Sequence, residues 1–466
     1  MNRVLFAVAC AAVAAGCGGP ASTPDIAGHW EGSITVAGGE LGILADFAGS
    51  GDSLSGTIDI PLQSAEGLHL AGVAVSGDSV RFDLAAGPGM ASFRGTISDS
   101  SMTGTLSQAG FLGAFTLTRK RPLQEVERPY VMTEVTIPAG GFSLAGTLSE
   151  PSDTSTGLPG VVMLTGSGAQ DRNENVFGFK VFDVIADYLT RQGFAVLRCD
   201  DRGVGGSGGA TPDMTDSTLA SDAVLMLEFM RSRPEIDSSK VGLFGHSEGS
   251  NIAFLAASLR PDLVAFVVSM AGPSVPGYDI LLGQVEALAR AAGKTDEEIG
   301  TVLSLQAQIM DSVLSGGSLD SLRPLIEDQI RDEIDRMPDA QKQALGDIDA
   351  YVRSAAEQSL ETVGSPWFKR FLSDNPSDNV KKLTCPVLAL FGSLDIQVPP
   401  ALNEEPMRQA LSANPRGMVM VFQGANHLFQ QAVTGTVEEY ATLPHEFVPG
   451  FLDSVGVWMK GAVLGG

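Results

Sequence analysis

Cysteine is scarce in this sequence, since the 466 residues include only four. A chain of this length can bury a large hydrophobic core, so its stability requires no disulfide or metal staple. Besides Cys10 and Cys17, the chain has Cys199 and Cys385, each at the edge of an apolar, strand-like run where small buried thiols usually lie. We therefore expect neither a disulfide nor a metal site.

Basic residues are outnumbered by acidic ones. The chain has 30 Lys and Arg against 55 Asp and Glu, which gives a formal net charge of −25 and a pI near 4.5. An acidic surface disfavours nucleic acids and anionic lipid surfaces as partners. Solubility is the simplest meaning of this charge, and a small-molecule substrate is the partner we expect. The sequence does not indicate an oligomeric state.

The first apolar run is short. Met1-Asn2-Arg3 precedes residues 4–15, which are too few and too rich in alanine for a stable membrane anchor. This pattern is typical of a secretory signal, so we expect the mature protein to be exported.

The end of this run suggests a lipid anchor. Ala14-Ala15-Gly16-Cys17 resembles a bacterial lipobox, in which small residues admit the signal peptidase and the cysteine becomes the lipidated N-terminus. The segment predicts a signal peptide over residues 1–17, lipidation of Cys17 and a cell-envelope lipoprotein of the outer membrane or periplasm. The protein would touch the membrane only through this lipid. An ordinary signal peptide cleaved near Cys17 is the alternative.

Residues 26–120 are rich in glycine, serine and threonine and lack helical periodicity. A short pattern recurs at residues 54–58, 93–97 and 102–106, which predicts an antiparallel β meander closed into a barrel or folded as a sandwich. The meander is loosely similar to small lipocalin-like barrels. It is either a filled structural module or a container for an apolar ligand. His29 and His69 lack acidic or cysteine neighbours at ligand spacing, so we interpret both as structural.

From residue 127 onwards, apolar runs alternate with amphipathic segments. The alternation predicts a doubly wound α/β sheet of parallel strands, covered by helices on both faces, over residues 127–466. The predicted strands are residues 160–164, 195–198, 240–244, 264–270, 386–391 and 418–422. The predicted helices are residues 181–192, 221–233, 250–260, 403–412 and 447–460. Residues 132–137 and 142–148 precede them as an antiparallel edge hairpin.

The pentapeptide Gly245-His246-Ser247-Glu248-Gly249 lies between an apolar strand and an apolar helix. The spacing G-x-S-x-G is typical of a sharp strand-to-helix turn in which the flanking positions must lack bulk. Such a turn pushes the serine hydroxyl out to where a substrate could meet it. We therefore interpret Ser247 as a nucleophile, although the pentapeptide alone also fits a plain turn in a glycine-rich chain.

Residues 274–375 form an insertion that is too long for a loop and rich in helix signals. Thr295 and Glu298 have the spacing of a capping box, and apolar residues follow on one helix face. Because the insertion follows a strand of the sheet, we expect a helical cap over Ser247. Where the cap returns to the sheet, Trp367 and Phe368 are either core residues or a wall of the substrate site.

A serine hydroxyl needs a base to take its proton and a third group to orient that base. In this fold class the three residues follow in the order Ser, Asp, His, each after a strand of the sheet. Asp395 follows the strand 386–391 and His427 follows the strand 418–422, so we predict Asp395 as the acid and His427 as the base. His246 is a poorer base because its side chain points away from Ser247, and we expect His445 to begin the last helix.

The developing oxyanion needs backbone N–H donors. The residue after the nucleophile, Glu248, should supply one, and the small residues after the first parallel strand should supply the other, with Ser167 or Gly168 favoured. A phosphate loop is the weaker alternative because the lysine of that motif is missing. The Glu248 carboxylate is either a solvated charge at a helix start or a reader of a cationic substrate group.

Several motifs together resemble one family. They are Asp171-Arg172-Asn173-Glu174, Asp200-Asp201-Arg202-Gly203-Val204-Gly205, the pentapeptide around Ser247 and Cys385-Pro386-Val387-Leu388-Ala389-Leu390. In these, the chain resembles the bacterial α/β-hydrolase family of esterases and serine-aminopeptidase-like hydrolases, from about residue 131 to the C-terminus. The resemblance implies a capped α/β-hydrolase that uses Ser247, Asp395 and His427 and no cofactor. The N-terminal β module lies outside it.

Three functions follow as hypotheses. The first is a serine hydrolase that cleaves carboxylic esters of small substrates through an acyl-enzyme on Ser247. The second is a peptidase or amidase with the same three residues, in which Glu248 or carboxylates of the cap bind a free amino group. The third is a non-enzymatic envelope protein whose β module binds a lipid or glycan.

Overall fold

The chain divides into two compact units, Met1–Glu125 and Val126–Gly466. The computed structural model describes residues 24–464 except 37–38, 61–64, 87–88, 99, 109–110, 121–127, 153–156, 292, 337–341, 343–344 and 346. The predicted signal peptide and Cys17 lie outside the described residues.

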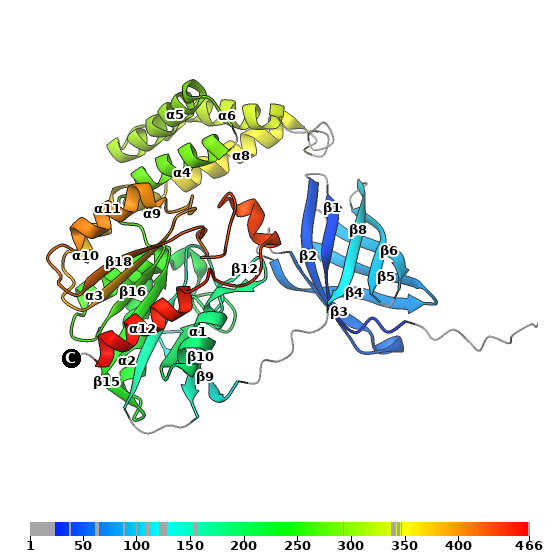
Figure 1. Ribbon diagram of the computed structural model, residues 1–466. Coiled ribbons are helices and arrows are strands. Elements are labelled where there is room, and N and C mark those ends of the chain that lie inside the picture. Colours follow the sequence, from blue (N-terminus) through cyan, green and yellow to red (C-terminus); the bar gives the residue numbers. More distant parts are fainter. Residues whose placement is uncertain are drawn as a thin grey trace, which may run out of the picture. The chain divides into compact units, whose positions relative to one another are not determined.

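The N-terminal unit is a closed antiparallel barrel of eight strands in chain order, in which β8 returns to pair with β1 (Figure 1). This confirms the predicted β-rich fold and selects the barrel over the sandwich. The strands are β1 (Gly28–Val36), β2 (Gly39–Ala48), β3 (Ser55–Ile60), β4 (Ala65–Ser76), β5 (Ser79–Ala86), β6 (Gly89–Ile97), β7 (Ser101–Gln108) and β8 (Phe111–Lys120).

The interior of the barrel is packed with aromatic rings. Phe82 stacks on Phe93 with ring centroids 4.7 Å apart, and Phe47 and Phe115 meet Phe82 edge-on. Trp30 is fully buried and donates its indole N–H to the Ile26 carbonyl. Close packing of this kind favours the filled structural module over a ligand container.

His29 lies close to two carboxylates of the barrel, one on its own strand and one on the neighbouring strand. His29 Nδ1 lies 2.9 Å from Asp46 Oδ1, and Nε2 lies 3.5 Å from Glu31 Oε1. Asp46 is the cross-strand partner of His29 in the pairing of β1 with β2. Directly opposed residues bring side chains together in a sheet, and this register is not visible in sequence spacing. Among the described residues no group of His, Cys, Asp and Glu could hold a metal ion.

The C-terminal unit is built on an eight-stranded sheet in the order β18-β17-β16-β15-β11-β14-β10-β9 (Figure 1). Its strands are β9 (Tyr130–Pro138), β10 (Ser143–Pro151), β11 (Leu158–Leu164), β14 (Ala195–Cys199), β15 (Ile236–His246), β16 (Val267–Met270), β17 (Val387–Gly392) and β18 (Gly417–Phe422). In this order, every pair of neighbouring strands from β18 to β14 is parallel. At the other edge β10 pairs antiparallel with β14, and β9 and β10 form the predicted antiparallel hairpin. The predicted strands of the α/β sheet are therefore confirmed.

Helices cover both faces of this sheet because its central strands are apolar along their whole length. One face packs on α1 (Val181–Arg191) and α12 (Phe451–Leu464). The other face packs on α2 (Asp216–Arg231), α3 (Glu248–Leu259) and α11 (Pro400–Ala410). The N-terminus of α2 lies earlier than predicted because Thr215 caps it by accepting the N–H of Thr218.

His445 does not begin the last helix, which is a correction to the sequence analysis. The helix α12 starts at Phe451. His445 lies in the preceding segment, where its ring stacks on Phe179 with centroids 5.8 Å apart.

Among the helices of the described residues, none combines the length and the apolar composition that a membrane span requires.

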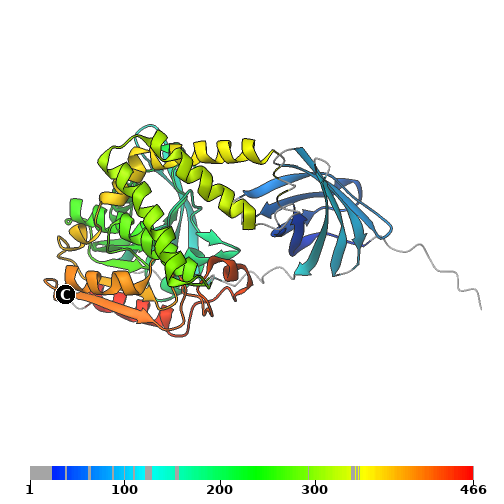
Figure 2. The same ribbon diagram turned by 90° about the horizontal axis from the view of Figure 1, so that it is seen from above.

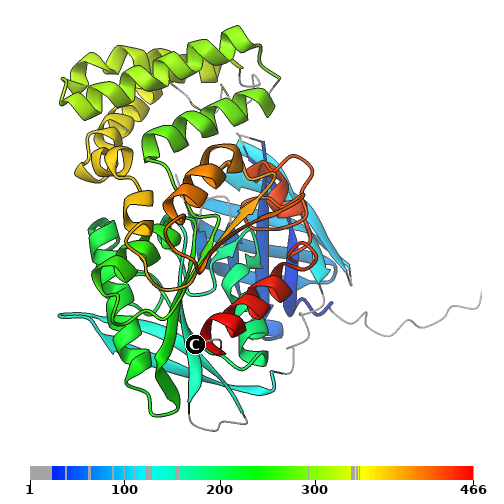
Figure 3. The ribbon, with the colours of Figure 1, turned by 60° about the vertical axis from the view of Figure 1, so that its left-hand side comes forward.

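The insertion between β16 and β17 is helical. Its main helices are α4 (Gly277–Ala291), α5 (Asp296–Ser315), α6 (Arg323–Arg336), α8 (Ile348–Val363) and α9 (Pro366–Ser373). They form a layer of their own beyond the ends of the strands, drawn in yellow-green to orange in Figures 2 and 3. The predicted capping box is formed, since Thr295 accepts the N–H of Glu298, whose carboxylate accepts the N–H of Thr295.

Candidate active site

Ser247 occupies a strained turn between β15 and α3. Its backbone has φ 51° and ψ −120°, a conformation that costs a non-glycine residue about 1–3 kcal/mol. A Cβ atom on Gly245 would stand 2.2 Å from the Gly249 carbonyl oxygen, and one on Gly249 would stand 2.1 Å from the Leu164 carbonyl oxygen. Both glycines are therefore needed because backbone fills the space where a side chain would begin. The Ser247 N–H donates to the Met270 carbonyl of β16, which fixes the turn to the sheet.

Asp395 and His427 meet at the carboxyl edge of the sheet, in the loops that follow β17 and β18. His427 Nδ1 lies 2.8 Å from Asp395 Oδ2. Asp395 Oδ1 accepts the N–H groups of Gln397 and Val398 at 2.8 and 2.9 Å, which holds the carboxylate in place. The Asp395 and His427 side chains are buried, so water competes little for their hydrogen bond.

The imidazole of His427 lies beside the turn that carries Ser247. Its ring centroid is 4.8 Å from that of His246, the residue directly before Ser247. Because Asp395 engages Nδ1, Nε2 is the nitrogen left for the serine proton. No hydrogen bond between Ser247 and His427 is formed among the described residues, and catalytic hydrogen bonds often reach their final length only with substrate bound.

The candidate oxyanion donors lie where β11 ends and α3 begins. The backbone N–H groups of Ser167 and Glu248 donate to no other group in the described part of the chain, so both are available to a ligand. Gly168 has φ +91°, and nothing lies within 4 Å of the place where a Cβ atom would stand. Ser167, Ser247 and Glu248 line the same cavity.

Glu248 begins α3, and its carboxyl is partly buried among other acidic groups. Burial and the nearby charges of Asp216 and Asp201 raise the pKa of Glu248 to about 7. The pKa of Asp216 is also raised, mainly by burial. The sequence could not show this crowding because Asp201, Asp216 and Glu248 come from three different elements.

A cavity of about 540 Å³ opens over Ser247. Apolar side chains of α4 and α9 form its outer wall, namely Ile280, Leu281, Phe368 and Phe371. Asp216, Glu248, Asn251, Gln284, Arg370, Asp374, Asn375, Asn379 and Gln397 add polar groups. Phe368 also packs among Met310, Val313 and Leu372, so it joins the cap core and the cavity wall at once. The side chain of Trp367 lies outside the described residues.

Glu174 is a site residue that sequence reasoning missed. Its side chain is 1% exposed, and Oε1 lies 2.7 Å from His246 Nδ1 and 2.6 Å from the Gly166 N–H nitrogen. Its backbone has φ 49°, which is uncommon for a residue with a side chain. Glu174 stands in one of the motifs that carry the family resemblance, but no periodicity or spacing points to its partners.

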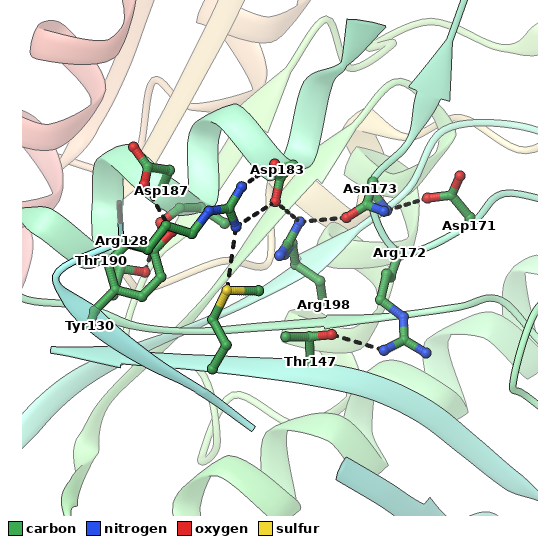
Figure 4. Close-up of polar contacts among 12 residues, drawn as sticks. Arg128, Tyr130, Thr147, Asp171, Arg172, Asn173, Asp183, Asp187, Thr190 and Arg198 are labelled. Atoms are coloured by element: carbon green, nitrogen blue, oxygen red, sulfur yellow. Dashed lines mark hydrogen bonds and ion pairs between the residues drawn. The ribbon is translucent and has the colours of Figure 1, made fainter. Parts of the chain in front are cut away.

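A buried arginine network anchors the loop that carries Glu174 (Figure 4). Arg198 is 2% exposed and donates to Asn173 Oδ1 and to Asp183 Oδ1, which also accepts from Arg128. In the same loop, Arg172 forms a two-point ion pair with Asp200. Bidentate pairs of this kind fix orientation as well as position, so the loop is held rigidly behind the site.

Comparisons with known proteins agree with this architecture. Residues 159–431 match the model of a family described as alpha/beta hydrolase fold. Esterase EstD of Thermotoga maritima is 24% identical over 308 residues, which are 65% of this chain and 62% of EstD. Esterase FrsA of Yersinia pestis is 30% identical over 148 residues, which are 32% of this chain and 33% of FrsA. The matched part thus spans less than two thirds of either relative.

Two solved structures are also similar to parts of this chain. Est1E from Butyrivibrio proteoclasticus with bound ferulic acid has a TM-score of 0.40 and 16% identity, covering 71% of this chain and 98% of Est1E. A proline iminopeptidase from Mycobacterium smegmatis has a TM-score of 0.44 and 16% identity, covering 72% of this chain and 99% of that structure.

Proposed function

The chain belongs to the alpha/beta hydrolase fold family, and from this premise we propose that it hydrolyses carboxylic esters of small molecules through an acyl-enzyme on Ser247. The observation that carries the proposal is the buried pair of Asp395 and His427, 2.8 Å apart, beside the strained turn of Ser247. A hydrogen-bonded carboxylate and imidazole next to a serine that lines a cavity form the arrangement that activates a serine nucleophile.

The chemistry proceeds in two halves. Ser247 Oγ forms a bond with the ester carbonyl carbon while its proton passes to His427 Nε2, and Asp395 stabilises the imidazolium. The N–H groups of Glu248 and Ser167 bind the oxyanion, with Gly168 as the alternative second donor. The bond to the alcohol oxygen then breaks, and the alcohol leaves with the proton from His427. Water attacks the acyl-enzyme by the same route, which releases the acid and restores the serine.

The size of the cavity supports a small substrate. A volume of about 540 Å³ is typical of sites for small molecules, and the cap helices leave little room for a long polymer. The names of the relatives EstD and FrsA, both esterases, support the ester as the bond that is cleaved.

The test uses the full chain and p-nitrophenyl esters of increasing acyl length. We expect turnover of short esters that falls as the chain lengthens, and labelling of Ser247 by a fluorophosphonate probe. Ser247→Ala, which removes only the hydroxyl, should abolish both. The proposal fails if the wild type turns over no ester or if Ser247→Ala turns over esters as fast as the wild type.

A second candidate is the hydrolysis of small peptides or amides that carry a free amino group. The carboxyls of Glu248 and Asp216 on the cavity wall favour it, because carboxylates bind ammonium groups. Aminoacyl naphthylamides distinguish the two candidates: their turnover without turnover of simple esters selects the peptidase.

We also propose that the protein is exported and anchored in the cell envelope by lipid on Cys17. The lipobox-like segment before Cys17 supports this. Expression in a Gram-negative host with labelled palmitate should give a labelled protein in the membrane fraction, and Cys17→Ser should abolish the label. Release of the unlabelled wild type into the soluble periplasm would select the ordinary signal peptide instead.

A further inference from the structure

A second carboxylate and imidazole pair lies directly behind Ser247. Glu174 Oε1 is 2.7 Å from His246 Nδ1, and His246 Nε2 is 3.1 Å from the carbonyl oxygen of His427. Both side chains are almost fully buried, at 1% exposure for Glu174 and 3% for His246. The proposed chemistry uses neither of them, so their burial needs another explanation.

The pair joins three parts of the site. Glu174 Oε1 also accepts the N–H of Gly166, the residue directly before the candidate oxyanion donor Ser167. His246 directly precedes Ser247 in the chain, and its Nε2 reaches the backbone of His427. The packing is tight, because a Cβ atom on Gly166 would stand 2.9 Å from Glu174 Oε1 and 3.5 Å from Ser247 Cβ. A displacement of the pair would therefore reach the oxyanion loop, the nucleophile and the base together.

The hydrogen-bond partners of His246 limit which of its ring nitrogens carry a hydrogen. A backbone carbonyl oxygen only accepts hydrogen bonds, so Nε2 carries a hydrogen. A second hydrogen on Nδ1 makes the ring an imidazolium opposite an ionised Glu174, whose Oε1 also accepts from Gly166. The other possibility is a neutral ring whose Nδ1 accepts a hydrogen bond from a protonated Glu174 carboxyl.

We propose that Glu174 and His246 form a buried carboxylate–imidazolium ion pair that positions the oxyanion loop and His427 for the reaction. Both are positioning residues, since they act through Gly166 and through the His427 backbone. The inference rests on the proposed function for its kinetic part but not for its spectroscopic part.

The surrounding charges agree with this assignment. Although burial works against protonation, the pKa of His246 is raised above its ordinary value by Glu174, by the His427 carbonyl and by the nearby Asp395. Asp201 is the further acidic group whose charge interacts with Glu174, and its own pKa is raised to about 7, mainly by burial. His246 thus lies among acidic residues from the loops after β11, β14 and β17.

The first test is nitrogen NMR on the full chain with ¹⁵N-labelled histidine, in which five histidines give a spectrum that single substitutions can assign. We expect both nitrogens of His246 to be protonated at neutral pH and to remain so above the ordinary histidine pKa of about 6.5. In Glu174→Gln the loss of charge should return His246 to a neutral ring. An unprotonated Nδ1 in the wild type would overturn the ion pair.

The second test is kinetic. Glu174→Gln keeps the size and one acceptor oxygen but removes the charge, so we expect kcat to fall about 10- to 100-fold with little change in KM, as for a misplaced reacting group. Without the Glu174 charge, His246 should lose its second proton at lower pH and with it one of its two hydrogen-bond donors. The alkaline limb of kcat/KM should therefore move to lower pH. Asp222→Asn is the matched control, a buried carboxylate paired with Arg202, and should keep the wild-type kcat and pH profile.

Two substitutions of His246 divide its roles and remain informative if Glu174→Gln does not fold. His246→Gln places a donor near the position of Nε2, and His246→Asn places one near Nδ1. We expect both to lower kcat and to slow fluorophosphonate labelling of Ser247, because each keeps only one link. Wild-type labelling rates in folded variants at Glu174 and His246 would overturn the positioning role. An absence of ester turnover alone would contradict only the proposed function, since the spectra and the labelling rates still report on the pair.

Discussion

His427 Nδ1 lies 2.8 Å from Asp395 Oδ2, while Oδ1 of the same carboxylate accepts two backbone N–H groups. The aspartate therefore holds one imidazole tautomer, with the hydrogen on Nδ1 and the free electron pair on Nε2. An amide at this position would present a donor or an acceptor in the wrong place for at least one of these partners.

From this geometry we predict that Asp395→Asn lowers kcat by about 10⁴-fold, because the imidazole is then held in the wrong tautomer. KM for a short ester should change little, since Asp395 does not bind the substrate. Initial rates with a p-nitrophenyl ester measure both. Glu405→Gln, on the exposed face of α11, is the control and should behave as the wild type. A loss of less than about tenfold would remove Asp395 from the proposed mechanism.

Gly249→Ala should disable the site. Its Cβ would stand 2.1 Å from the Leu164 carbonyl oxygen and 2.4 Å from that of Thr165, both of them backbone atoms that cannot turn aside. The turn must then move away from the oxyanion loop, and a misplacement of about 1 Å costs roughly 100-fold in rate. Rate assays and thermal melts of the variant measure this effect.

The matched control is Gly300→Ala in α5, where a Cβ atom meets nothing within 4 Å. A helical glycine replaced by alanine should raise the free energy of unfolding by about 0.5–1 kcal/mol and leave kcat unchanged. Equal losses of activity in Gly249→Ala and Gly300→Ala would show that the steric argument is wrong.

Much of the α/β sheet could be predicted because its signals are local. Central parallel strands are buried on both faces and therefore appear as apolar runs, as in β17, where all six residues are buried. The positions of Asp395 and His427 followed from one topological rule, since the carboxyl ends of parallel strands share one edge of the sheet.

Other parts depended on partners far away in the sequence. Glu174 lies 72 residues before His246, and only the fold of the loop anchored by Arg198 brings them together. Asp46, one of the two acidic partners of His29, is placed by strand register, which a glycine-rich meander specifies weakly. The pKa of Glu248 depends on Asp216 of another helix, and a rule for isolated helix ends leaves this neighbour out.

Phe82→Ala should weaken the barrel without affecting catalysis. Phe82 is fully buried and contacts three other phenylalanine rings, so its truncation should cost about 3–5 kcal/mol of unfolding free energy in the N-terminal unit. All proposed catalytic residues belong to the unit Val126–Gly466, so kcat for short esters should stay at the wild-type level. Calorimetry on the full chain with parallel rate assays measures both effects.

Leu112→Ala, at a side chain that is 75% exposed, is the control and should change stability by less than about 0.5 kcal/mol. A parallel loss of kcat in Phe82→Ala would show that the barrel contributes to the reaction.

We predict that Glu248 gives the site a pH-dependent preference for cationic substrates. Its pKa is raised to about 7, so the carboxyl is mostly neutral below pH 7 and mostly anionic above it. A substrate with a fixed positive charge gains attraction only in the anionic state. Choline esters and the corresponding 3,3-dimethylbutyl esters have nearly the same shape and differ in charge, so the ratio of their kcat/KM values isolates this effect.

We predict that this ratio rises about fivefold between pH 6 and 8, which corresponds to roughly 1 kcal/mol for a partly screened charge pair. Glu248→Gln should remove the rise while the neutral ester keeps its kcat, because the backbone N–H proposed to bind the oxyanion is unchanged. Asp216 faces the same cavity and also has a raised pKa, so Asp216→Asn should shift the rise to lower pH by relieving the repulsion on Glu248. A ratio that is flat in the wild type, or a rise that persists in Glu248→Gln, would show that another group reads the charge.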